Sequence, residues 1–312
     1  MKKNRNRSEI STEALKKQIF QGVSLFIVLA ALVTGLIFLF RSRIYEAGIK
    51  RSLLTEWESG SWEAAYKKSR EGLAVKPLDT FVLTINGFAA YQMALAQVNT
   101  EQTLAYIEES IQSLRKALLN KNADRDGRIR YVLGKAYYAK GPDYADLAVK
   151  YLEAAKTASF TAGDFDEYLG LSYAAVRDYR KSVEAFSASL EPGREDSDLL
   201  LLHIAQSYMG LEDWETAKAY LVRCAELSKD TDLTIKARLL LGKTLVHMGN
   251  TGDAVAAFES VLETSGENAE ASYELGEIYA ALGDTTRARA AWRRAFRADP
   301  NFTPVVARLN TM

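Results

Sequence analysis

A sequence motif of small and large apolar residues, the repeat phrase, recurs along this chain with a period near 34 residues. Gly242 and Gly276 are 34 positions apart, and each directly follows a leucine. A fixed period of this length is typical of chains built from stacked copies of one two-helix unit. One such unit cannot bury its own apolar face, so the copies have to pack in series. The last copy shows the phrase best, as Leu275, Gly276, Tyr279, Ala288, Trp292, Ala295 and Pro300.

The phrase predicts five clear repeats, in residues 127–160, 163–197, 198–231, 235–268 and 269–302. Two local departures are expected, namely two extra residues in the turn at 140–144 and a longer junction at 230–234. Before residue 127 the repeat phrase is less complete, so one or two degenerate repeats are predicted there. Gly87 and Tyr91 fit a first helix, Leu114 and Ala117 fit a second helix, and an expanded connection is expected at 96–103.

Before that, residues 61–76 fit a second helix that Pro77 ends, with residues 44–59 as its partner. At the other end of the chain, Pro304 begins a short closing helix. The predicted organisation is a basic tail (1–17), a transmembrane helix (18–40), a juxtamembrane helix with degenerate repeats (41–126), the main array (127–302) and a closing helix (303–312).

These residues resemble the tetratricopeptide-repeat family. In that family the small residue lets two helices approach closely, and the large residues fill the space between them. The resemblance implies an all-α solenoid of about five to seven helix-turn-helix repeats that binds other proteins. A generic helical bundle would share the apolar periodicity but not the recurrence of Gly, Tyr and Ala at matching offsets.

Residues 18–40 form a run of 23 residues without a charge. As a helix they would extend roughly 35 Å, which is enough to cross a bilayer core of about 30 Å. A cleaved signal peptide is the alternative, but its apolar region is shorter and ends at a small-x-small site. Here Arg41 and Arg43 follow the run at once, so we expect a retained anchor. Ala31 and Gly35 would let two such spans pack, which leaves a homo-oligomer open.

Positive charge lies on both sides of this run. Residues 1–17 hold six Lys and Arg, and residues 41–51 hold four. The excess before the run predicts a cytoplasmic N-terminus and a repeat array outside the cytoplasm, in the periplasm of a diderm bacterium.

The composition excludes several functions. The 40 basic and 40 acidic residues balance, whereas nucleic-acid binders carry a basic surplus. The two histidines, His203 and His247, have no His or Cys partner at metal-ligand spacing, and Cys224 occupies a small packing position of the repeat. We therefore predict no metal, no cofactor and no enzyme activity.

The resemblance also implies where a partner would bind, because positions 2, 5, 9 and 12 of the first helices line the binding groove in this family. Asp164 and Val246 are among the matching positions. The candidates that we expect to contact a partner are Arg128, Tyr131, Lys135, Tyr138, Glu167, Leu199, Leu202, Gln206, Met209, Lys236, Leu239, Lys243, Glu270, Tyr273 and Glu277.

Chaperone-binding members of the family clamp a peptide carboxylate with Lys and Asn, and no Asn occurs at these positions. The face instead alternates between basic, acidic and apolar repeats. The apolar strip of Leu199, Leu202 and Met209 is the candidate for the strongest contacts. Burial of the strip against a neighbouring helix is the alternative.

The predicted function is a membrane-anchored scaffold that binds partner proteins. This layout resembles bacterial single-span repeat proteins that serve export or envelope-folding machinery, and others that build collars around flagellar motors. A ligand-responsive sensor subunit of a membrane complex is the alternative.

Overall fold

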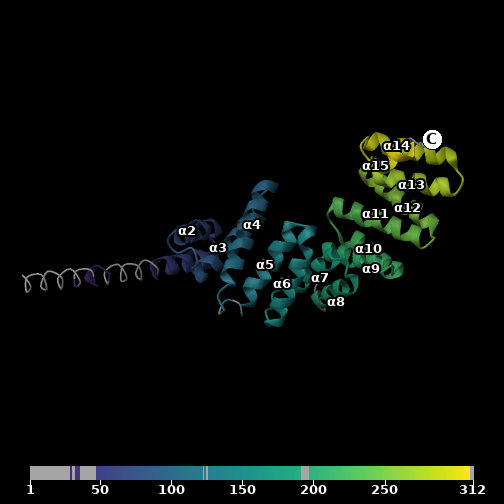
Figure 1. Cartoon of the computed structure of the whole chain (residues 1–312). Coiled ribbons are helices and arrows are strands. Elements are labelled where there is room, and N and C mark those ends of the chain that lie inside the picture. Colours follow the sequence, from purple (N-terminus) through teal and green to yellow (C-terminus); the bar gives the residue numbers. More distant parts are fainter. Residues whose placement is uncertain are drawn as a thin grey trace, which may run out of the picture. The chain divides into compact units, whose positions relative to one another are not determined.

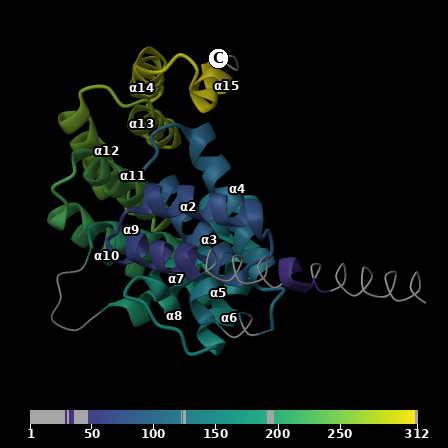
Figure 2. The ribbon, with the colours of Figure 1, turned by 90° about the vertical axis from the view of Figure 1, so that its left-hand side faces the viewer.

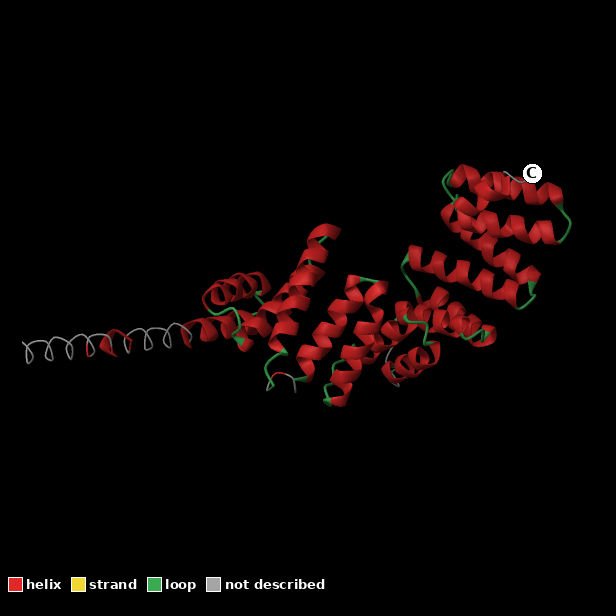
Figure 3. Cartoon of the chain, in the orientation of Figure 1, coloured by secondary structure: helices red, strands yellow, loops and turns green. Residues whose placement is uncertain are grey.

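The computed structural model describes residues 29, 32–35, 47–121, 123, 126–190 and 197–309. Figure 3 shows this part of the chain as helices joined by loops, and no strand occurs in it. It divides into two compact units, Met1–Ala123 and Asp124–Met312. The predicted span at 18–40 lies outside the described residues, apart from 29 and 32–35. No helix within the described ranges has the length and apolar character needed to cross a bilayer.

Between residues 47 and 121, which the structure describes without a gap, the first unit contains four helical segments, coloured purple to blue in Figure 1. They are residues 47–58, α2 (Trp62–Val75), α3 (Thr80–Leu95) and α4 (Thr100–Ala117). The expected connection at 96–103 is shorter than predicted. Asn99 accepts hydrogen bonds from the backbone N–H groups of Glu101 and Gln102, so α4 already begins at Thr100.

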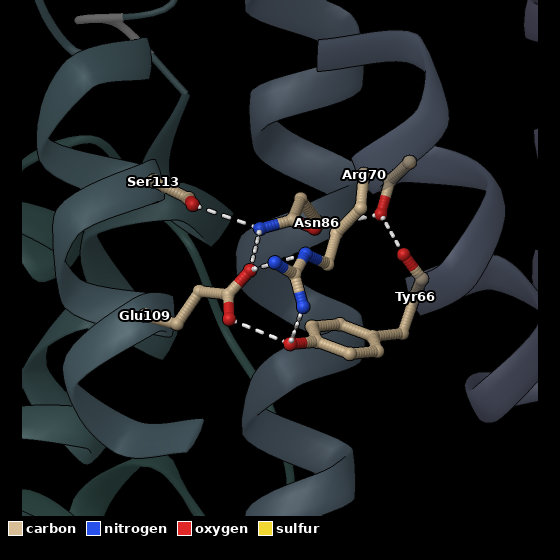
Figure 4. Close-up of polar contacts among 6 residues, drawn as sticks. Tyr66, Arg70, Asn86, Glu109 and Ser113 are labelled. Atoms are coloured by element: carbon tan, nitrogen blue, oxygen red, sulfur yellow. Dashed lines mark hydrogen bonds and ion pairs between the residues drawn. The ribbon is translucent and has the colours of Figure 1, made fainter. Parts of the chain in front are cut away.

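A polar network joins α2, α3 and α4 (Figure 4). The Glu109 carboxylate accepts hydrogen bonds from the Tyr66 hydroxyl at 2.6 Å and from Asn86 Nδ2 at 3.2 Å. Asn86, which is buried, also donates to Ser113 Oγ at 2.9 Å. Burial and the hydrogen bond to Glu109 raise the pKa of Tyr66 to about 12. Every polar group of this set has a partner, so the network fixes the three helices without an unpaired buried group.

In its described residues, 126–190 and 197–309, the second unit contains five helix pairs and one closing helix (Figure 1, Figure 2). The pairs are α5 (Gly127–Lys140) and α6 (Ala145–Thr157), α7 (Phe165–Ala175) and α8 (Tyr179–Ser189), α9 (Asp198–Gly210) and α10 (Trp214–Leu227), α11 (Thr231–His247) and α12 (Thr251–Ser265), and α13 (Ala269–Ala281) and α14 (Thr285–Ala298). The closing helix is α15 (Thr303–Leu309). These elements confirm the predicted all-α repeat solenoid.

The two predicted irregularities have different outcomes. The turn after α5 does hold extra residues, because Gly141 adopts a φ of 125° and a 3₁₀ turn, η2 (Pro142–Tyr144), follows it. The predicted longer junction at 230–234 is wrong, since residues 231–234 form the first turn of α11. Asp230 caps this turn by accepting hydrogen bonds from the backbone N–H groups of Asp232 and Leu233.

The recurring glycines bring the two helices of a pair into contact. A Cβ placed on Gly242 would lie 2.6 Å from the ring carbons of Phe258, which has no exposed surface. Ser182 stands where the phrase has alanine, and it keeps its small volume while using its hydroxyl. That hydroxyl donates to the Gly170 carbonyl at 2.9 Å and lies 2.9 Å from the hydroxyl of Ser207 in the next repeat.

Candidate protein-binding face

The first helices of the five pairs lie in series, because α5 contacts α7, α7 contacts α9, α9 contacts α11, and α11 contacts α13. We call the surface lined by these helices the first-helix face. All fifteen candidate residues lie on these helices. Leu202, Leu239 and Tyr131 are nevertheless 0%, 8% and 8% exposed, so they pack in the core. The prediction that these three residues line an open groove is wrong.

The strongest polar cluster on this face joins α5 to α7. Lys135 Nζ lies 2.6 Å from Asp164 Oδ2, and the Tyr131 hydroxyl donates to Asp164 Oδ1. Burial alone would raise the pKa of Asp164, but the hydrogen bonds from Lys135 and Tyr131 lower it overall. The Lys135 ammonium also lies 4.2 Å from the ring centroid of Tyr168. The basic and aromatic residues of α5 are therefore engaged by the next repeat.

Two further candidates lie beside this cluster. Tyr138 packs edge-on against Tyr168, with the ring centroids 5.8 Å apart. Burial, followed by the charge of Asp164, raises the pKa of Glu167. Glu167 forms no ion pair with any described residue. Arg128 is exposed and pairs with Asp126, the residue that caps its own helix.

A second cluster joins α11 to α13. Lys243 Nζ lies 2.5 Å from Glu270 Oε1 and 3.7 Å from Glu274 Oε1. Burial lowers the pKa of Lys243, but the two carboxylates outweigh this effect and raise it. Burial raises the pKa of Glu274. Lys243 thus holds two acidic side chains of the next repeat.

The end of the first-helix face is covered by α15. Arg308 donates two hydrogen bonds to Glu277, at 2.9 and 2.6 Å. The Trp292 indole donates to the same carboxylate at 3.1 Å. Tyr273 packs edge-on against Phe302, which precedes α15, with the centroids 5.7 Å apart. Glu277 and Tyr273 are therefore engaged by the chain itself.

The middle of the face differs from both ends. Among the described residues, no ion pair links α7 to α9 or α9 to α11. Leu199 is 45% exposed there, and Gln206 and Met209 are partly exposed on the same helix. Lys236 on α11 is exposed and forms no ion pair with an acidic residue that the structure describes. We call Leu199, Gln206, Met209, Val246 and Lys236 the open patch.

Alternating charge along the first-helix face is thus explained largely by contacts within the chain. The repeat phrase carries no signal that Asp164, Glu274 and Arg308 pair with the candidate residues. Their separations from these partners are 29 positions for Lys135–Asp164 and 31 positions for Glu277–Arg308. A search for opposite charges about one repeat apart would have found them.

Comparison with family models identifies the repeats. The models for tetratricopeptide repeats match residues 200–231 and 239–301. The chain contains tetratricopeptide repeats. Such repeats generally mediate protein–protein interactions and are scaffolds rather than enzymes. The curated proteins include no match to this chain.

Several solved structures share the fold. One is the C-terminal part of a TPR repeat-containing protein from Cytophaga hutchinsonii, with 17% identity, a TM-score of 0.58 and coverage of 83% of this chain and 98% of that one. Another is PilW, a type IV pilus biogenesis factor, with 18% identity, a TM-score of 0.56 and coverage of 72% and 98%. A tetratricopeptide repeat protein from Parabacteroides merdae has 16% identity, a TM-score of 0.50 and coverage of 84% and 96%.

The reactive side chains of the unit are engaged in packing. Cys224 is buried, and its thiol donates to the Asp198 carbonyl at 3.1 Å. His203 stacks on Phe186 and hydrogen-bonds Gln206, and burial lowers its pKa. His247 stacks on Trp214 with the ring centroids 4.2 Å apart. These contacts are structural, and the geometry of the face suits binding.

Proposed function

We propose that this chain is a membrane-anchored scaffold that binds partner proteins through the first-helix face. The observation that carries the proposal is the open patch. Elsewhere on the face, ion pairs and α15 engage most of the charged candidate residues. In the open patch, by contrast, Leu199 and the Lys236 ammonium are exposed and Met209 is partly exposed. Apolar and cationic side chains that are unpaired in the free protein can contribute most to an interface when a partner covers them.

The anchor in this proposal is the uncharged run at 18–40, whose length suits a bilayer. With the more basic flank in the cytoplasm, the repeats stand outside it. Tethering raises the local concentration of a bound partner, which lets a modest affinity suffice. An envelope complex is the setting we propose, such as export or envelope-folding machinery or a flagellar-motor collar. PilW, which shares the fold, is a type IV pilus biogenesis factor.

Crosslinking in intact cells, followed by purification of the full-length chain from membranes, tests the binding surface. We expect Leu199→Asp and Lys236→Glu to lose the crosslinked partner while keeping full helical content. Leu282→Asp, which changes an exposed leucine in the turn after α13, and Lys229→Glu are matched controls that should retain it. Equal recovery of the partner with all four variants would show that the open patch is not the binding surface.

The anchor and its orientation need separate measurements. We expect the chain to remain in the membrane fraction after alkaline extraction, and a variant lacking residues 1–40 to be released. A C-terminal reporter that is active only outside the cytoplasm should be active. Release of the intact chain, or an inactive reporter, would contradict the anchor or the orientation respectively. A partner that is recovered only after a stimulus would favour the sensor alternative.

A further inference from the structure

A second groove lies on the other side of the last repeats, between α12 and α14. It has a volume of about 610 Å³. Its floor is apolar, and its two walls carry opposite charges. The lining residues used here are Leu262, Leu275, Tyr279 and Ser272 in the floor, Arg287, Arg294 and Arg297 on α14, and Glu259 and Glu263 on α12.

This groove is separate from the first-helix face. On α13, Ser272, Leu275 and Tyr279 line the groove, whereas Glu270 and Glu277 lie on the first-helix face. Leu275 and Tyr279 are each two positions from Glu277, and two positions correspond to about 200° around a helix. One ligand segment therefore cannot fill both surfaces.

The basic wall has an unusual composition for this chain. The helix α14 carries five arginines, no lysine and no acidic residue, although the whole chain has no net charge. Arg287 is paired with Asp284 at 2.5 Å, and Arg294 donates to the Gly266 carbonyl at 3.0 Å. Arg297 is exposed and makes no ion pair with a described residue. Arginine suits bidentate recognition of a carboxylate.

A corresponding groove lies between α6 and α8 in earlier repeats. There, side chains of the chain itself contact the acidic wall. Glu153 follows Leu152 on α6 as Glu259 follows Phe258 on α12, and both grooves contain the tyrosine of the repeat phrase. There the Tyr173 hydroxyl donates to Glu153 at 2.6 Å, and Lys181 Nζ lies 4.0 Å from the same carboxylate. Side chains of α7 and α8 thus reach the wall formed by α6. The groove is smaller, at about 440 Å³.

The α12–α14 groove lacks this closure. Tyr279 lies beside the Arg287 guanidinium, which is 4.6 Å from its ring centroid, and Arg287 pairs with Asp284 on its own helix. Within the described ranges, Glu259 and Glu263 form no ion pair. Ser272 has no exposed surface, and its hydroxyl lacks any hydrogen-bond partner in the described chain. Among the described residues, no ion pair therefore crosses this groove between its acidic and basic walls.

We propose that the α12–α14 groove is a docking site for an amphipathic helix of a partner protein. This helix presents carboxylates to the arginines of α14, an apolar side chain to Leu262 and Leu275, and a basic side chain to Glu259 and Glu263. A groove between two helices accepts a third helix along its ridges. The two glutamates repel phosphate groups, so the walls fit a protein segment better than a lipid or nucleic-acid surface.

Binding of a synthetic probe to the full-length chain in detergent tests this site. The probe is a labelled helical peptide with a leucine stripe flanked by glutamates on one side and by lysines on the other. We expect saturable binding that weakens as salt is raised. Arg297→Glu should weaken it about tenfold, because an attraction becomes a repulsion. Arg289→Glu, which makes the same charge change on α14 outside the groove lining, should weaken it less than about twofold.

A charge exchange checks the register. Glu259→Lys should weaken binding of the probe, and a second peptide with glutamate on both flanks should bind this variant better than it binds the unaltered chain. Equal weakening by Arg297→Glu and Arg289→Glu would overturn the proposal in favour of general attraction to α14. Absence of probe binding would also overturn it. Loss of probe binding in Leu199→Asp with no effect of Arg297→Glu would place the peptide on the first-helix face instead.

Discussion

Arg308 of α15 holds Glu277 of α13 through two hydrogen bonds, at 2.9 and 2.6 Å. The guanidinium also lies 5.1 Å from the ring centroid of Trp292, whose indole donates to the same carboxylate. The closing helix is therefore attached to the last repeat by a charged contact as well as by the burial of Val305.

We expect Arg308→Ala to loosen α15 without unfolding the array. The ion pair is partly exposed, so the loss of unfolding free energy should be small. Hydrogen exchange should accelerate in α15 and remain unchanged in α11. Combining Arg308→Ala with Glu277→Gln in a double-mutant cycle separates the pair from the packing of the helix. An additive cycle would show that the pair contributes nothing.

Gly242 is predicted to tolerate no side chain, because Phe258 fills the space where a Cβ would lie. Gly242→Ala should lower the unfolding free energy by about 1–3 kcal/mol, as expected for overpacking. Gly252→Ala is the matched control, since nothing lies within 4 Å of a Cβ at Gly252, near the start of α12. Chemical denaturation of both variants measures the difference. Equal stability of the two would contradict the close approach of α11 and α12.

Much of the fold is predictable from the sequence because the phrase reports contacts inside one repeat. Gly242 and Phe258 meet within a pair, so their spacing recurs with the period. Contacts between repeats are not constrained in this way. Leu202 illustrates the limit: it belongs to a run of four leucines, and its burial depends on packing with residues such as Ala237 on α11. The phrase alone does not determine which of these leucines is covered.

The same distinction applies to the candidate site. The repeat phrase identifies positions on the first helices. It does not show which residues of the chain pair with the charged side chains at those positions. Asp164 lies at the start of α7 and Arg308 beyond the last repeat, and each neutralises a residue that we had assigned to a partner. The open patch is what remains after these internal pairs are accounted for.

Replacement of Lys243 should make stability depend on pH in a defined direction. Lys243→Met leaves Glu270 and Glu274 close together without their cation, and should cost about 1 kcal/mol near neutral pH. Burial already raises the pKa of Glu274 in the native chain, so its folded form favours the proton. Such a group stabilises the folded state below its unfolded pKa, and this contribution is lost as the pH rises through the folded pKa.

The stability deficit of Lys243→Met should therefore shrink as the pH is lowered from neutral through the raised folded pKa of Glu274 toward about 4.5, the ordinary value for glutamate. Denaturation at a series of pH values measures it. Lys236→Met removes an exposed lysine that pairs with no acidic side chain in the described part of the chain, so it should show almost no deficit at any of these values. A deficit for Lys243→Met that is constant with pH would contradict coupling between the lysine and the two carboxylates.

The buried thiol offers a final prediction. Burial raises the pKa of Cys224 to about 11, and the side chain has no exposed surface. Only the thiolate reacts readily with thiol reagents. At neutral pH Cys224 is therefore protected from modification both by its small thiolate fraction and by its burial. A thiol reagent should modify the folded chain at least about a hundredfold more slowly than the chain in denaturant. Modification at equal rates would show that the α9–α10 pair opens freely, and it would remove the basis for assigning Cys224 to packing rather than to chemistry.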